Sequence, residues 1–153
     1  MFYFHKNQFA LIHSSSEYPT WPWLFIQRGK PLCGETYQDA QGIFRATLSP
    51  SGANAAHLRL VPEIHHGEAR SNFIADNGIL RQDSNKPTKV FESLALDLNL
   101  KEGQTLIITE DPKIEGSLGH YFLGHRNEND IQPKILLIKV MRSKYDEMFQ
   151  PSN

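Results

Sequence analysis

SLALDLNLKEGQTLIIT, residues 93–109, is the stretch that decides the fold class. Leu94 begins a row of leucines at every second position up to Leu100, separated by small or polar residues. This period-two pattern is typical of a strand with one buried and one solvent-facing side. KEG (101–103) then makes a turn, and residues 105–109 form a second, β-branched run. The stretch predicts a β-hairpin with a type I turn at Lys101 and Glu102, followed by Gly103 in the left-handed conformation of a bulge.

Short strand patterns and turn residues alternate along the rest of the chain. Pro22 predicts an edge position for the strand around it, because proline cannot donate to a central ladder. Trp21 and Trp23 lie two residues apart, so they should face the same side and cap the core. Asn77-Gly78 is the strongest two-residue hairpin signal. The expected strands are residues 2–4, 9–12, 21–26, 43–48, 57–64, 72–74, 79–80 and 135–141, the last of them central because it is largely apolar.

Helical patterns are scarce. Residues 34–42 (GETYQDAQG) are bounded by glycines and rich in helix-tolerant residues, which predicts one short helix. No long segment keeps a 3.6-residue period. The sequence therefore predicts an all-β, single-domain β-sandwich or barrel-like fold with at most one or two short helices. The domain spans residues 1–142, with 1–33 as a truncated or peripheral N-terminal part, and residues 143–153 form a polar C-terminal tail.

Composition excludes some classes of function. Of 153 residues, 39% are hydrophobic and 22% charged, as in an ordinary globular chain. Sixteen Lys and Arg balance seventeen Asp and Glu, so the basic excess of a nucleic-acid binder is missing. The basic residues near the C-terminus are diluted by acidic ones and indicate a solvated face rather than a phosphate-binding patch. They are Arg126, Lys134, Lys139, Arg142 and Lys144.

Cysteine usage and the N-terminus bear on the compartment. Cys33 is the only cysteine, so neither an internal disulfide nor a CxxC motif can form. Residues 1–16 lack the cationic start and long apolar run of an export signal. No stretch approaches the length of a membrane-spanning helix. We therefore expect a cytoplasmic location by default, unless the N-terminus is truncated.

The seven histidines of the chain provide enough candidate ligands for a metal site. On a strand, Glu63 and His65 point to one face and His66 to the other, so one imidazole joins that carboxylate. Further ligands would have to come from elsewhere, and His120 and His125 are the candidates. The set Glu63, His65, His120 and His125 would suit a divalent metal ion, whereas the alternative is a strand end with hydrogen-bonded or exposed imidazoles.

Other reactive side chains lack the setting that their chemistry needs. Ser117 and His120 lie in GSLGH (116–120), which has neither the lysine of a phosphate loop nor the strained G-x-S-x-G of a nucleophilic serine. The sequence favours a tight connection there, with no helix following it. Cys33 follows Pro31 and precedes Gly34, which indicates a turn or core thiol rather than a nucleophile.

Two segments resemble a known family. QGIFRATLSPSGANAAHLRLVPEI (41–64) and VFESLALDLNLKEGQTLII (90–108) are similar, in this order, to the β-domain of bacterial secretins, the outer-membrane channel subunits of secretion systems. The resemblance covers residues 41–108 and implies a structural β-module. The usual Gly-Gly-Leu after the Gly-Gln-Thr strand is replaced by Thr109-Glu110-Asp111. PEIHHGE (62–68) and GSLGHYF (116–122) resemble strings in bacterial proteins to which no activity is attached.

These observations predict a non-enzymatic β module that acts in assembly or protein interaction, through a protein partner or self-association at a strand edge. No cofactor, nucleic acid or membrane-spanning segment is expected. The alternative is a small metal-dependent enzyme or metal-binding protein that resembles the cupin β-barrels, using Glu63, His65, His120 and His125. The sequence lacks the His-x-His of that family, which favours the module.

Overall fold

The computed structural model describes residues 9–26, 32–51, 54–76, 79–111, 113–114, 116–126 and 131–141. Its main sheet runs in the order β1 (Phe9–Ile26), β2 (Leu32–Pro50), β3 (Ala55–His65). The far side of β3 is shared by two strands, because β6 (Thr88–Val90) pairs with its end and β7 (Leu96–Lys101) with its beginning. All these pairings are antiparallel, and the 3₁₀ helix η1 (Glu92–Leu94) joins β6 to β7.

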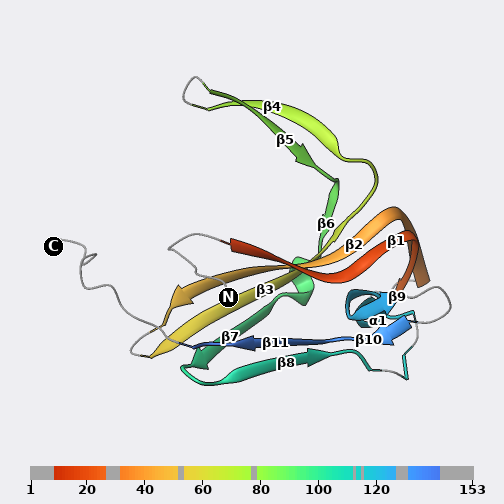
Figure 1. Cartoon of the computed structure of the whole chain (residues 1–153). Helices are drawn as coiled ribbons and strands as arrows, with labels where there is room; N and C mark the ends of the chain where they lie inside the picture. The colour runs from red at the N-terminus through yellow and green to blue at the C-terminus, as the bar shows by residue number, and fades with distance from the viewer. Residues whose placement is uncertain are drawn as a thin grey trace.

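Two short ribbons and a small helix make up the second layer (Figure 1). β8 (Thr105–Thr109) pairs with β11 (Ile135–Lys139), and β9 (Gly124–Arg126) pairs with β10 (Ile131–Pro133). The helix α1 (Leu118–Phe122) precedes β9. The inward side chains of the β8–β11 ribbon pack on the core of the main sheet, so the two layers form a sandwich of antiparallel sheets that is not closed into a barrel.

A third ribbon extends away from both layers. β4 (Arg70–Asp76) and β5 (Ile79–Asn85) pair with each other and, within the described sheets, with no other strand. Figure 1 shows this hairpin standing clear of the sandwich. The pairing of Asp76 with Ile79 agrees with the two-residue hairpin predicted at Asn77-Gly78, although those two residues lie outside the described part of the chain.

Aliphatic side chains from alternate positions form one part of the core. Leu58 and Leu60 on β3, with Ala46 on β2 and Leu100 on β7, are buried on the same face of the sheet. This is the buried face that the leucine row predicted. Within that row, however, Leu100 is buried whereas Leu94 and Leu96 are exposed. The second layer covers this face with Leu106, Ile108, Leu136 and Ile138.

Aromatic rings fill the other part of the core. Trp21 is fully buried and lies 5.5 Å from the ring of Tyr18, 5.0 Å from Tyr121 and 5.5 Å from Phe122. Trp23 is half-buried and contacts Phe91 edge-on. The predicted capping role of both tryptophans is therefore confirmed, as is the edge position of the strand that contains Pro22.

Three local predictions were wrong, and each failed through tertiary pairing. Residues 34–42 are not a helix but part of β2, which pairs with β1 and β3 at once. β7 and β8 do not form a hairpin, since β7 pairs with β3 and β8 with β11. The final strand is not central, because β11 belongs to a two-stranded ribbon.

Two further expectations need qualification. The strands expected at 9–12 and 21–26 are parts of one long strand, because the polar segment between them contains a bulge within β1 between His13 and Glu17. Residues 116–120 lead into the helix α1, contrary to the expected absence of a helix there. The expected strand at 2–4 and the polar tail at 143–153 lie outside the described residues.

Candidate functional site

The outer face of the β8–β11 ribbon carries large exposed apolar side chains. Ile107 and Leu137 are directly opposite each other in the register and are 61% and 62% exposed. Ile135 is 63% exposed, and Met141, just beyond the end of β11, is 62% exposed. We call Ile107, Ile135, Leu137 and Met141 the outer apolar face. Such an exposed apolar cluster is typical of a contact surface.

This ribbon carries apolar residues on both faces, although Thr105, Thr109 and Lys139 also lie on its outer face. Along TLIIT (105–109) and ILLIK (135–139), residues at alternate positions are half-buried against the core and the intervening ones are exposed. An antiparallel strand with one wet face normally places polar residues on that face. The three aliphatic residues on the outer face therefore fit a surface that another molecule covers.

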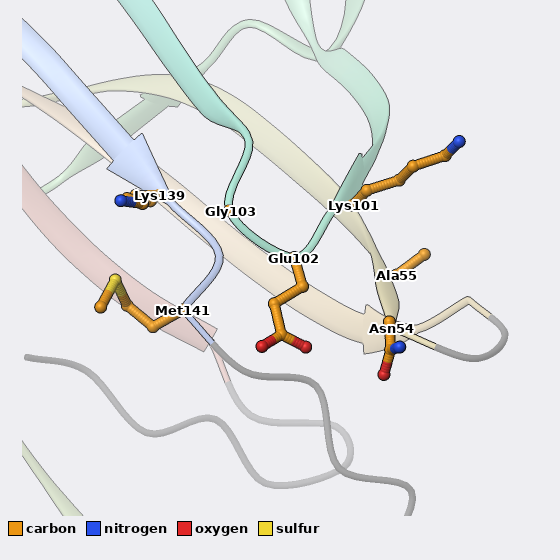
Figure 2. A pocket seen from close by; sticks show the side chains of 7 residues that line it. All are labelled: Asn54, Ala55, Lys101, Glu102, Gly103, Lys139 and Met141. Atoms are coloured by element: carbon orange, nitrogen blue, oxygen red, sulfur yellow. The ribbon is translucent and has the colours of Figure 1, made fainter.

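A shallow, open hollow of about 800 Å³ adjoins one end of this face (Figure 2). It lies where the turn between β7 and β8 meets the start of β3 and the end of β11. The backbone N–H of Glu102 donates to Asn54 O at 2.8 Å, and that of Gly103 donates to Val140 O at 2.8 Å. The hollow is lined by Asn54, Ala55, Lys101, Glu102, Gly103, Lys139 and Met141. Its two ammonium groups and one carboxylate suit a polar rim beside an apolar surface.

The predicted metal ligands are divided among three separate contacts. The Glu63 carboxylate lies 3.0 Å from His65 Nε2, which confirms that these two side chains share one face of β3. His120 Nδ1 instead lies 3.1 Å from Glu110 Oε2, and His125 Nδ1 lies 2.7 Å from Ser16 Oγ. Among the described residues, no group of three His, Cys, Asp or Glu side chains could hold a metal ion.

Glu63 is engaged in an ion-pair network on the outer face of the main sheet. Its buried carboxylate lies 2.9 Å from Arg45 Nε, and Arg45 also reaches Glu92 at 3.4 Å. Arg59 bridges Glu92 and Asp97, at 2.7 Å to each. The network ties η1 and β7 to β3, and its exposed pairs contribute little to stability individually. This network was not predicted from the sequence, although the charged residues that alternate with Leu58 and Leu60 along β3 were a visible signal.

Ser117 has a structural role in this arrangement. Its Oγ accepts the backbone N–H of His120 at 3.1 Å, which caps the N-terminus of α1. This contact gives Ser117 the structural role of an N-cap. Cys33 lies in β2, and its side chain is outside the described part of the structure.

A second polar cluster joins β2 and β6 to His66, the residue that follows β3. The Tyr37 hydroxyl donates to the Glu35 carboxylate, which lowers the pKa of Glu35, and Lys89 lies 3.5 Å from the same carboxylate. Burial, followed by the bond to Glu35, raises the pKa of Tyr37 above its ordinary value. The His66 ring lies 4.7 Å from the Tyr37 ring, and burial lowers the pKa of His66 more than Glu35 raises it.

The C-terminal basic residues do not gather into one described patch. Lys134 Nζ donates to the backbone oxygen of Ser14 at 3.3 Å, whereas Lys139 is exposed beside the hollow. The side chains of Arg126, Arg142 and Lys144 are outside the described part. No helix in the described ranges is both long enough and apolar enough to cross a membrane.

Comparisons with known proteins add no relative to this picture. Searches of protein-family models, of curated proteins and of solved structures found no match for the chain.

Proposed function

We propose that this protein is a non-enzymatic β module that acts in assembly or protein interaction, with the outer apolar face as its contact surface. The observation that carries the proposal is the exposure of Ile107, Ile135 and Leu137 at neighbouring positions on one face of the β8–β11 ribbon. Covering one such side chain contributes about 1 to 2 kcal/mol, since fully burying a Leu or Ile contributes up to about 3. Together the four side chains would supply several kcal/mol to an association.

The surroundings of this face also support an interface. Contact surfaces combine an apolar centre with a polar, solvent-accessible rim. Here Thr105 and Thr109 flank Ile107 on β8, and Lys139 faces Thr105 across the ribbon. The adjoining hollow adds Lys101 and Glu102, which could give a partner orientation through charge.

The resemblance to the secretin β-domain also favours a β module, because it concerns the order of strand-forming segments. Its two segments fall on β2 and β3 and then on β7 and β8. The metal-dependent alternative has weaker support. Glu63 and His65 lie together, but Arg45 already occupies the carboxylate, and His120 and His125 each have another partner.

Site-specific photo-crosslinking tests the proposal. A photoreactive phenylalanine analogue replaces Leu137 in the outer apolar face or, as the matched control, the exposed Thr36 on β2. In cells that express the full chain, we expect illumination to give one discrete protein adduct from position 137 and none from position 36. The adduct is either a second copy of the chain or another protein, and mass spectrometry identifies which. Equal labelling at the two positions would overturn the proposal.

A further inference from the structure

The free edge of β8 has no partner in the described sheets. One side of β8 pairs with β11, and the other side pairs with no described strand. Figure 1 shows β8 on the outer rim of the second layer. An unpaired edge of this kind presents backbone N–H and C=O groups that can accept another strand.

The ladder with β11 determines which residues present those groups. Val140 N–H donates to Gln104 O at 3.3 Å, just beyond the last register pair of Thr105 with Lys139. In an antiparallel ladder, alternate residues direct their backbone groups to alternate sides. Leu106 and Ile108 therefore bond towards β11, whereas Thr105, Ile107 and Thr109 direct their N–H and C=O groups to the free edge.

The sequence of β8 is self-complementary about its central residue. TLIIT (105–109) has threonine at both ends, an aliphatic residue next to each threonine, and Ile107 in the middle. When two copies pair antiparallel about Ile107, Thr105 of each lies opposite Thr109 of the other. The residues with outward-directed backbone groups are also symmetric about Ile107, so they meet as hydrogen-bonded pairs.

The edge of β8 lacks the features that prevent strand association. It contains no proline, charged residue or bulge, and it is β-branched at four of its five positions. β1, at the edge of the main sheet, shows the contrast, because it carries both Pro22 and the bulge after His13. Within the described sheets, the edge strand β1 thus has features that hinder strand association, whereas β8 has neither of these two.

We propose that two copies of the chain join through their β8 edges, antiparallel, with a two-fold axis at Ile107. This inference goes beyond the proposed function: the partner is a second copy, the contact is a strand edge, and the outer apolar face stays uncovered for the association proposed above. The product is a four-stranded sheet in the order β11, β8, β8, β11. Its outer face carries Leu137, Ile107 and their two symmetry equivalents in one row, which doubles the outer apolar face. Such a contact is isologous and closes as a dimer.

Disulfide trapping tests the register of this pairing. In a Cys33→Ser background, Ile107→Cys places the two sulfurs on a hydrogen-bonded pair, whose Cα atoms are about 5.5 Å apart and within disulfide range. Leu137→Cys is the matched control, because it lies on the same face and is similarly exposed. Across three strand spacings its Cα atoms are about 14 Å apart, which is too far for a disulfide. We expect mild oxidation to give a covalent dimer from the first variant and none from the second.

Sedimentation of two further variants tests the backbone contribution. Ile107→Pro removes the outward N–H and leaves the bonds to β11 in place, whereas Ile107→Val keeps that N–H and the β-branched shape. We expect the wild-type chain and the valine variant to dimerise with rising concentration, and the proline variant to stay monomeric at ten times that concentration. Circular dichroism confirms that both variants are folded.

Each contrary result separates this inference from the proposed function. A monomeric wild-type chain overturns the self-pairing, and the proposed function survives it if position 137 still crosslinks to another protein. A covalent dimer from Leu137→Cys without one from Ile107→Cys also overturns the edge pairing, because it indicates face-to-face stacking. A dimer that the proline variant leaves unchanged overturns it as well.

Discussion

The imidazole of His66 couples the stability of the fold to pH. It packs against Tyr37, with Glu35, Lys89 and His65 nearby, and burial lowers its pKa below the ordinary value of 6.5. The folded chain therefore favours the neutral ring. Its contribution to stability is complete above pH 6.5 and is lost as the pH falls from 6.5 through the lowered pKa of the folded state.

We expect the free energy of unfolding to decrease between pH 7.5 and 5. Replacing His66 by glutamine, which keeps a planar polar group but does not titrate, should make this decrease shallower. Urea unfolding at several pH values measures both slopes. Identical slopes in the wild-type chain and the variant would show that His66 does not contribute.

Glu63 shows how far residue-level prediction from the sequence extends. The strand period alone placed Glu63 and His65 on one face, and their 3.0 Å contact agrees. The period says nothing about Arg45, because that residue lies on another strand and reaches Glu63 only through the β2–β3 register. The contact of Glu110 with His120 could not be predicted from the sequence either, because it depends on the path of the chain from β8 to α1.

At the scale of elements, two positions require glycine for different reasons: Gly103 in the turn between β7 and β8, and Gly42 on β2. Gly103 has a φ of 83°, and a Cβ there would meet nothing within 4 Å. Gly42, on β2, has the opposite problem, because its Cβ would lie 3.1 Å from Phe122 and 3.2 Å from Trp21. One position is restricted by backbone conformation and the other by space.

Substitutions should separate these causes. Gly103→Ala should cost about 1 to 2 kcal/mol, and Gly103→Asn less, because asparagine tolerates the left-handed region. Gly42→Ala should cost about 1 to 3 kcal/mol through overpacking, and the double variant Gly42→Ala, Phe122→Leu should recover part of that loss. Thermal or urea unfolding measures each change. An asparagine variant at 103 as unstable as the alanine variant would contradict the conformational explanation.

The same turn shows why the hairpin prediction failed. The sequence correctly indicated two strands and a left-handed Gly103. A hairpin would place both strands in one sheet, yet Leu100 and Leu106 face the same core from opposite layers. The choice of β3 and β11 as partners depends on residues distant in sequence. The helix predicted at residues 34–42 failed for a similar reason, since pairing with β1, joined by β3 from Gln41 onwards, outweighs their tolerance of helix.

At the scale of the whole molecule, stability should be distributed unevenly. The β4–β5 ribbon pairs only with itself among the described sheets, and isolated two-stranded ribbons are marginally stable. β3 is paired on both sides and buried. We expect backbone amides in β4 and β5 to exchange with solvent at least 100-fold faster than those of Leu58 and Leu60.

Hydrogen exchange followed by mass spectrometry or NMR measures this difference. The amides of β8 and β11 should exchange at intermediate rates, since one face of their ribbon packs on the core. Equal protection of the β4–β5 ribbon and β3 would contradict the expectation and would indicate that another part of the chain covers the ribbon.

The strand order also has a consequence for how the chain is made. Every strand of the main sheet lies before residue 102, whereas β8 and β11, which cover the core face, follow at residues 105–109 and 135–139. During synthesis the sheet can close while Leu58 and Leu60 still lack their cover. The nascent chain therefore passes through a stage with a finished but uncovered sheet, which is the kind of species that aggregates or recruits chaperones.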